Sequence, residues 1–317
     1  MAVIAIDIIS TSMTSAALGN SGKVLFKETK SIEGCKGNQV SSMIKSQILK
    51  ILQQFKNKPI QIKSAGISVP GIFYSKTGFV WAPNIEGWEN YPLKQEMKSL
   101  LIEQNLHVKI ADKRKCLILG EMWLGAAQHT KNAIYLSIGK GISAGIMVDG
   151  CILHGSTDGV GAAGWMGLAS AYSDQYSSRG HFESVASAEG LLASARLMVE
   201  SQKKYNGRLK NKDLSLMTTI DLFEAYMLKD PVAVKVFQQA VKYWGVASAN
   251  LISLFNPDIL IIGGSLFGPA QQFIDSIREE AAKWAQPLYM KNVKIIGSQL
   301  GANTGLIGAG YLAMKKV

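Results

Sequence analysis

Cysteine is scarce in this sequence, and it has neither a long apolar run nor a basic leader. The three cysteines, Cys35, Cys116 and Cys151, are odd in number and widely spaced, which excludes a disulfide framework and a cysteine-rich zinc knuckle. No apolar run reaches the roughly 18 residues that a membrane-spanning helix needs, and Met1 leads directly into the apolar stretch 3–6. We therefore expect an unexported protein of the reducing cytoplasm that does not bind membranes.

Acidic residues are also in short supply. The chain has 23 Asp and Glu against 34 Lys and Arg, which gives a formal net charge of +11. Such an excess can indicate a nucleic-acid partner. The lysines, however, are scattered among neutral polar residues, as in 50–58 and 203–212, which is typical of a solvated surface. No recognition motif accompanies them, so we expect no nucleic-acid partner and favour a small-molecule ligand.

The length and the strand pattern indicate two lobes. A chain of 317 residues is long for one hydrophobic core. Residues 3–27 and 133–154 share one pattern of strand, turn, strand, turn, strand, and helices alternate with strands after each. Two related lobes with mixed sheets and a ligand cleft would explain the repeat, although two unrelated α/β domains could also produce it. Asp230-Pro231 and Asn256-Pro257 predict the start and the end of a long helix.

Two glycine turns follow apolar strands in the second half. They are Gly139-Lys140-Gly141 and Gly263-Gly264-Ser265. Glycine lets backbone N–H groups approach a phosphate closely, but a glycine pair after a strand is as often a plain turn. Each turn alone is therefore a weak signal of nucleotide binding.

Five segments, taken in order, resemble the ROK family (repressor, open reading frame, kinase) over nearly the whole chain. They are 66–71 (GISVPG), 82–88 (APNIEGW), 138–145 (IGKGISAG), 256–264 (NPDILIIGG) and 305–309 (GLIGA). They are similar to the family's G-I-G-V-P-G, A-P-N…G-W, L-G-T-G-I-G-G-G, N-P…I-G-G and G-x-x-G-A motifs.

The resemblance implies an α/β fold, namely the two-lobed actin-like ATPase (ribonuclease H-like) fold of sugar kinases. It implies an N-terminal lobe of residues 1–115, completed by a helix at about 303–317, and a C-terminal lobe of residues 116–302. The implied activity is ATP-dependent phosphorylation of a hexose hydroxyl between the lobes, with Mg²⁺ neutralising the phosphates. The family commonly forms dimers, so we expect a homodimer.

The resemblance also implies site residues. The implied nucleotide-binding residues are Asp7, Thr11, Gly139, Lys140, Gly141, Gly263, Gly264 and Ser265, with Asp7 as a candidate Mg²⁺ ligand. The implied sugar-binding residues are Ser68, Gly71, Asn84, Asp112, Lys113 and Glu183.

The catalytic segment departs from the family pattern. Residues 116–121 (CLILGE) align with the family's C-A-A-L-G-E, so 112–115 (DKRK) align with the preceding N-D-A-N. The general base position therefore holds Lys113, and an ammonium has no lone pair with which to accept a proton. A shift by one residue would make Asp112 the base but would break the adjacent match, so we favour Lys113. The three cations could instead form a solvated turn.

Other family positions are altered as well. The phosphate loop D-x-G-G-T reads 7–11 (DIIST) without either glycine, and Lys140 stands where the family has Thr. Trp165 and Leu168 replace a sugar-holding Glu and His, although they could simply be core residues. Residues 174–181 lack every cysteine of the family's zinc segment, so we expect no structural zinc.

The sequence leaves three candidate functions. The favoured one is a kinase relative that has lost phosphoryl transfer and binds a sugar, a phosphosugar or a nucleotide. A working hexose or N-acetylhexosamine kinase with displaced groups is the alternative, and a repressor would need a DNA-binding head that we do not expect, because the first strand begins at residue 3. Lys113 and Lys140 predict either an anionic ligand or an internal carboxylate partner such as Asp7, Asp112 or Glu183.

Overall fold

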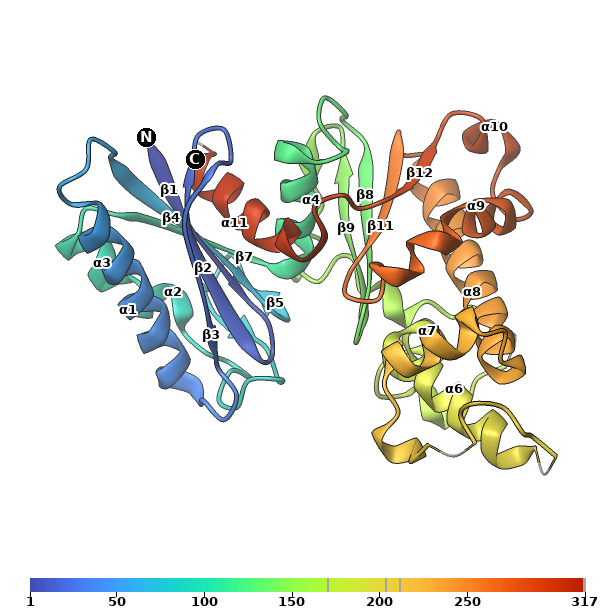
Figure 1. Ribbon diagram of the computed structural model, residues 1–317. Helices are drawn as coiled ribbons and strands as arrows, with labels where there is room; N and C mark the ends of the chain where they lie inside the picture. Colours follow the sequence, from blue (N-terminus) through green and yellow to red (C-terminus); the bar gives the residue numbers. More distant parts are fainter. Residues whose placement is uncertain (170, 203, 211, 316–317) are drawn as a thin grey trace. The chain divides into compact units, whose positions relative to one another are not determined.

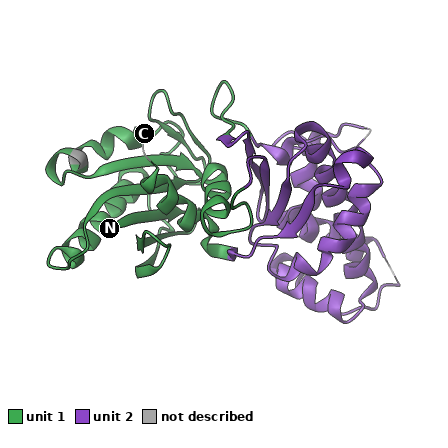
Figure 2. Ribbon diagram, turned by 90° about the horizontal axis from the view of Figure 1, so that it is seen from above, with its two compact units in different colours: residues 1–129, 152–160, 302–317 green, residues 130–151, 161–301 purple. Residues whose placement is uncertain are grey.

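The computed structural model describes residues 1–169, 171–202, 204–210 and 212–315 (Figure 1). The chain forms two compact units, which Figure 2 shows in different colours. The first comprises Met1–His129, Ile152–Val160 and Ala302–Val317, and the second comprises Thr130–Cys151 and Gly161–Gly301. Among the described residues, no helix combines the length and the apolarity that a membrane crossing requires.

A five-stranded sheet forms the centre of the first unit, in the order β3-β2-β1-β4-β7. Its strands are β1 (Ala2–Ile8), β2 (Ser12–Gly19), β3 (Val24–Ser31), β4 (Ile62–Val69) and β7 (His107–Asp112). The first three pair antiparallel, whereas β4 pairs parallel with both β1 and β7. The short strands β5 (Ile72–Phe73) and β6 (Val80–Trp81) form a separate hairpin.

Helices cover both faces of this sheet (Figure 1). The helices are α1 (Gly37–Phe55), α2 (Leu93–Glu96), α3 (Lys98–Glu103), α4 (Lys113–Leu124) and α11 (Thr304–Met314). Side chains alternate along β1, so Ile4 and Ile6 belong to the core under α1, whereas Val3 and Ala5 belong to the core under α11. The α11 helix lies very close to β4, because a side chain at Gly66 would clash with the Ala309 carbonyl.

The second unit contains a corresponding sheet in the order β10-β9-β8-β11-β12. Its strands are β8 (Ala133–Ile138), β9 (Ile142–Val148), β10 (Cys151–Ile152), β11 (Ile259–Gly263) and β12 (Lys294–Gly297). Strand β8 pairs antiparallel with β9 and parallel with β11, which in turn pairs parallel with β12. The strand order therefore repeats position by position between the two units, which favours related lobes over two unrelated domains.

Helices make up most of the rest of the second unit. They are α5 (His181–Ala186), α6 (Ala188–Ser201), α7 (Thr219–Met227), α8 (Pro231–Phe255), α9 (Ile274–Ala282) and α10 (Pro287–Met290). Short 3₁₀ turns lie at Ala163–Trp165, Asp174–Tyr176, Leu214–Leu216, Pro269–Phe273 and, at the border of the first unit, Gly301–Asn303.

The limits of the first unit differ from the lobe boundary expected at residue 115. Helix α4 belongs to the first unit, because it packs along α11, with Gly308 directly against the Cys116 backbone. Residues 152–160 belong there as well, because Asp158 and Gly159 are bonded to α4 and to the segment after β4.

Candidate functional site

The side chain at the predicted base position is paired with a buried carboxylate. Lys113 is the first residue of α4, and its Nζ lies 2.7 Å from Oδ1 and 2.5 Å from Oδ2 of Asp7, near the end of β1. The Asp7 side chain is 8% exposed and that of Lys113 is 27% exposed. Gly305, in the first turn of α11, leaves room for the pair, since a Cβ there would lie 2.5 Å from the Lys113 Nζ. Lys113 therefore has an internal partner, as one of the two predicted alternatives requires.

The pairing of Lys113 with Asp7 affects whether Asp7 can bind Mg²⁺. Mg²⁺ binds carboxylate oxygens in near-octahedral geometry at about 2.1 Å. Both Asp7 oxygens are within hydrogen-bond distance of the Lys113 ammonium, which carries the positive charge that a metal would supply. As the side chains stand, Asp7 does not fit the role of a Mg²⁺ ligand.

Asp112, the alternative base, is fully buried at the end of β7. It is the N-cap of α4, where its Oδ1 accepts a hydrogen bond from the Lys115 backbone N–H at 3.3 Å. The same oxygen lies 3.2 Å from the Arg114 Nε, and Oδ2 lies 3.0 Å from the Lys115 Nζ. Both carboxylate oxygens thus face cations of the protein itself.

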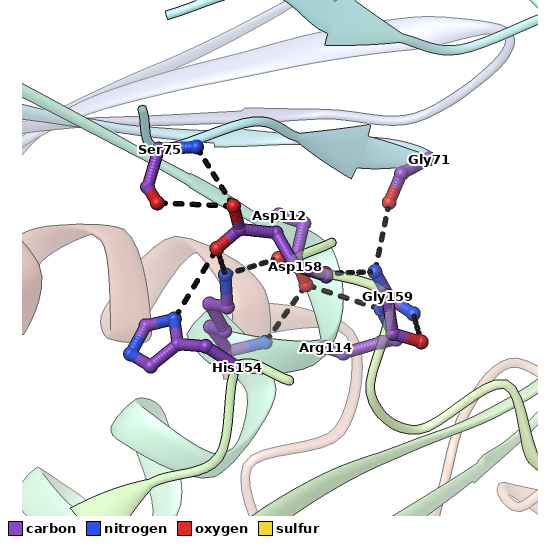
Figure 3. Close-up of polar contacts among 8 residues, drawn as sticks. Gly71, Ser75, Asp112, Arg114, His154, Asp158 and Gly159 are labelled. Atoms are coloured by element: carbon purple, nitrogen blue, oxygen red, sulfur yellow. Dashed lines mark hydrogen bonds and ion pairs between the residues drawn. The ribbon is translucent and has the colours of Figure 1, made fainter. Parts of the chain in front are cut away.

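Asp158 completes this buried cluster, which we define as Asp112, Arg114, Lys115 and Asp158 (Figure 3). Its Oδ2 accepts hydrogen bonds from the backbone N–H and the hydroxyl of Ser75, both at 3.0 Å. Its Oδ1 lies 3.2 Å from the Lys115 Nζ and 3.5 Å from Nδ1 of His154.

Arg114 connects the cluster to the backbone around it. Its guanidinium donates to the carbonyl oxygens of Gly159 at 3.0 Å, Asp158 at 3.3 Å and Gly71 at 3.5 Å. Arg114 and Lys115 are each only 8% exposed. The interpretation of 113–115 as a solvated turn is therefore wrong for these two residues, because their charges are neutralised inside the first unit.

The pKa of Asp158 reflects its position in this cluster. Burial alone would raise it, but the hydrogen bonds from Ser75 and the nearby Lys115 ammonium outweigh burial and lower the pKa below its ordinary value. Asp158 is therefore ionised at neutral pH and stabilises the cluster as a carboxylate.

Four further predicted residues of the first unit are partly buried in the sheet and partly exposed in turns. Ser68 is fully buried on β4 and lies opposite Asp7 of β1 in the sheet register. Gly71 has a left-handed backbone with φ of 74°, and its carbonyl accepts from Arg114. Thr11 and Asn84 are exposed in turns. The structure therefore brings Asp7, Ser68, Asp112 and Lys113 to the ends of three neighbouring strands.

Predicted residues of the second unit meet around the turn between β8 and β9. The Ile142 N–H donates to Oε2 of Glu183 at 2.6 Å, and a Cβ at Gly141 would lie 2.9 Å from that oxygen. Gly139 lies against Ser265, and Gly264, with φ of 102°, lies directly on the Ile138 backbone, where a side chain would clash. Gly263 is the last residue of β11.

Lys140 and Arg179, near this turn, both lie close to Glu189, whereas Glu183 accepts a backbone hydrogen bond. Burial raises the pKa of Glu183, although the Ile142 N–H and the Arg179 charge oppose that rise. The Lys140 side chain is 81% exposed, and its Nζ lies 3.6 Å from Glu189. Glu189 also accepts from Arg179 at 2.5 Å. Lys140 is therefore a surface residue with a nearby carboxylate.

The altered sugar and zinc segments fold around His181. Its Nδ1 accepts a hydrogen bond from the Leu168 N–H at 3.2 Å, and burial lowers its pKa. Trp165 is 58% exposed and Leu168 is half-buried, so Trp165 is not a core residue. Within the described ranges, no three His, Cys, Asp or Glu side chains are placed to share a metal ion. The expected lack of zinc stays a prediction.

Sequence reasoning missed Asp158, Ser75 and His154. Three consecutive cations at 113–115 were a signal that carboxylate partners exist, because buried cations are costly when unpaired. Asp158 lies 43 residues from Lys115, and only the fold places them together.

Comparison with known proteins identifies the family of this chain. The sequence model of the ROK family matches residues 3–316. A glucokinase of Halalkalibacterium halodurans is 28% identical over 322 residues, covering 99% of this chain and 95% of that protein.

Two solved structures resemble the fold closely. A ROK family glucokinase from Streptomyces griseus in complex with glucose and AMPPNP has a TM-score of 0.79 at 23% identity, covering 99% of both chains. A ROK family transcriptional regulator, a homologue of the E. coli MLC protein, has a TM-score of 0.85 at 24% identity, covering 98% of this chain and 77% of that chain. The predicted fold class, that of the actin-like sugar kinases, is thereby confirmed. Because the family match extends over nearly the whole sequence, this chain belongs to the ROK family.

Proposed function

We propose that this chain is a sugar-kinase-like protein of the ROK family that has lost, or nearly lost, phosphoryl transfer and acts by binding a sugar, a phosphosugar or a nucleotide. The observation that carries the proposal is the Lys113–Asp7 pair. A kinase needs a group that accepts the proton of the attacking hydroxyl, and an ammonium paired with a carboxylate cannot accept it. We further propose that the protein is a homodimer, as the resemblance led us to expect, and that it is cytoplasmic, as its few cysteines led us to expect.

The alternative is an active, glucokinase-like kinase of hexoses or N-acetylhexosamines that uses Asp112 as the base. A general base must come within hydrogen-bond reach of the substrate hydroxyl. Asp112 is fully buried, caps α4 and faces Arg114 and Lys115 with both oxygens. To act as a base it would have to leave these partners, which would cost the stability of the buried cluster.

The direct test is a coupled assay for ADP release with glucose, mannose, fructose and the N-acetylated hexosamines. We expect turnover at background, because loss of a general base alone costs about 10²- to 10⁴-fold. Turnover in the ordinary enzyme range, about 1 to 10³ s⁻¹, with any of these sugars would contradict the proposal. Residual turnover that disappears in Asp112→Asn but persists in Lys113→Ala would favour the alternative.

A second prediction concerns the nucleotide. The glycine-rich segments 263–265 and 305–309 keep the family pattern for the adenosine part, whereas the loop at 7–11 has lost both glycines that would approach phosphates. Because Asp7 is neutralised by Lys113, Mg²⁺ should contribute little. We therefore expect calorimetry to show ADP binding at least as tightly as ATP, with affinities that change less than about threefold between excess Mg²⁺ and excess chelator. Tight ATP binding that requires Mg²⁺, without ADP binding, would contradict this expectation.

A further inference from the structure

A pocket of about 390 Å³ lies in the second unit, within the segment where the resemblance implied sugar and zinc ligands. We call it the aromatic pocket and define it by six of its lining residues, Trp165, Tyr172, Tyr176, Ser177, Gly180 and His181. Trp165 and Tyr172 are 58% and 73% exposed, so much of their apolar ring surface faces solvent. Trp165 stands where the resemblance implied a sugar-holding Glu, but the observation that carries the proposed loss of phosphoryl transfer is the Lys113–Asp7 pair and not this pocket.

The described lining of the pocket carries no formal charge at neutral pH. Among the described residues that line it there is no Lys, Arg, Asp or Glu. Because the His181 Nδ1 accepts a hydrogen bond from Leu168, the proton of the neutral ring is on Nε2. Burial lowers the pKa of His181, which keeps the ring neutral at pH 7.

One side of the pocket is held by contacts within the second unit. The Tyr176 ring contacts His181 edge-on, with centroids 4.7 Å apart and planes at 88°, and His181 packs against Tyr243 at 5.4 Å. Gly180 has a φ of 80°, and a Cβ there would lie 2.6 Å from the Gly164 carbonyl oxygen. The Ser177 hydroxyl donates to the Asp174 carbonyl at 2.7 Å, which leaves its lone pairs as acceptors.

We propose that the aromatic pocket binds an uncharged planar aromatic group, such as a phenol or the aryl portion of a larger ligand. Aromatic rings attract one another in offset-stacked and edge-on arrangements at centroid distances of about 4.5–7 Å, and the pocket offers rings in several orientations. A ring ligand would cover the exposed faces of Trp165 and Tyr172, and Ser177 can accept a hydrogen bond from its hydroxyl. A charged ligand would find no counterion in the lining.

The experiment compares phenol with cyclohexanol by saturation-transfer NMR and titration of the full-length protein at pH 7. Both probes are uncharged six-membered rings with one hydroxyl, so they differ mainly in aromaticity and planarity. We expect the dissociation constant of phenol to be about tenfold lower than that of cyclohexanol, and the preference to disappear in Trp165→Ala. Trp284→Ala is the matched control, because Trp284 is 65% exposed in the same unit but outside the pocket.

A second variant, Tyr172→Ala, keeps the test decisive if Trp165→Ala fails to fold, since Tyr172 is the more exposed residue. Equal affinities for the two probes, no detectable phenol binding, or phenol binding that survives both substitutions would overturn the proposal. Glucose binding that depends on Trp165, without phenol binding, would assign the pocket to a sugar ring and would also overturn it. None of these outcomes depends on the coupled kinase assay, so the two proposals fail separately.

Discussion

Replacement of Lys113 with alanine is expected to lower the melting temperature by about 4–12 °C. The substitution leaves the Asp7 carboxylate, whose side chain is 8% exposed, without its cation. Breaking a buried ion pair by removing one partner costs about 3–5 kcal/mol, and the partial exposure of Lys113 reduces this to about 2–3 kcal/mol. For a protein with domains of this size, each kcal/mol shifts the melting temperature by about 2–4 °C. Differential scanning calorimetry of the variant and the wild type measures the shift directly.

Two further variants distinguish the effect of losing the Lys113–Asp7 ion pair from the effect of losing any one positive charge. Lys140→Ala removes an exposed ammonium 3.6 Å from Glu189, and its effect should stay within about 0.5 kcal/mol. The double variant Lys113→Ala, Asp7→Ala removes both charges and should be more stable than Lys113→Ala alone. A melting temperature that is unchanged in Lys113→Ala would show that the ammonium is not a structural partner of Asp7.

Individual helices and strands could be predicted from the sequence because their signals are local, whereas the actin-like fold was implied by the resemblance to the ROK family. Asp230-Pro231 predicted the start of α8, where Asp230 accepts hydrogen bonds from the backbone N–H groups of Val232 and Ala233. Asn256 ends that helix in a left-handed conformation with φ of 42°. The first strand of the pattern predicted within 133–154 is β8. Short-range chemistry of caps, turns and alternating strands thus determined these elements.

The contacts of the charged residues could not be predicted in the same way. The alignment of 116–121 predicts that Lys113 occupies the base position, but its partner Asp7 lies 106 residues away. A long, flexible side chain can reach solvent or a carboxylate from the same backbone position, and the sequence does not distinguish the two. Burial of Arg114 and Lys115 became evident only when the fold placed residues 158 and 159 beside α4.

Asp158→Asn is expected to lower the free energy of unfolding by about 2 kcal/mol at pH 7, which corresponds to about 4–8 °C in melting temperature. The variant loses the charge that Lys115 faces at 3.2 Å but keeps an oxygen that can accept from Ser75. Asn suits the backbone, because Asp158 has a left-handed φ of 57° and Asn tolerates that conformation well. A loss of stability in this variant would therefore result from the missing charge and not from strain in the backbone turn. Calorimetry or chemical denaturation at pH 7 measures the loss.

The effect of Asp158→Asn on stability should also depend on pH in a definite direction. The pKa of Asp158 in the folded protein is lowered, so the carboxylate contributes stability that is fully present above its unfolded pKa of about 3.9. That contribution is lost as the pH falls below about 4 and then passes through the lowered pKa that Asp158 has in the folded protein. The stability difference between wild type and Asp158→Asn should therefore be largest at pH 7 and shrink steadily below pH 4. Asp149→Asn is the control, because Asp149 is also left-handed but exposed, and a loss of stability there as large as in Asp158→Asn would refute the role of the buried cluster.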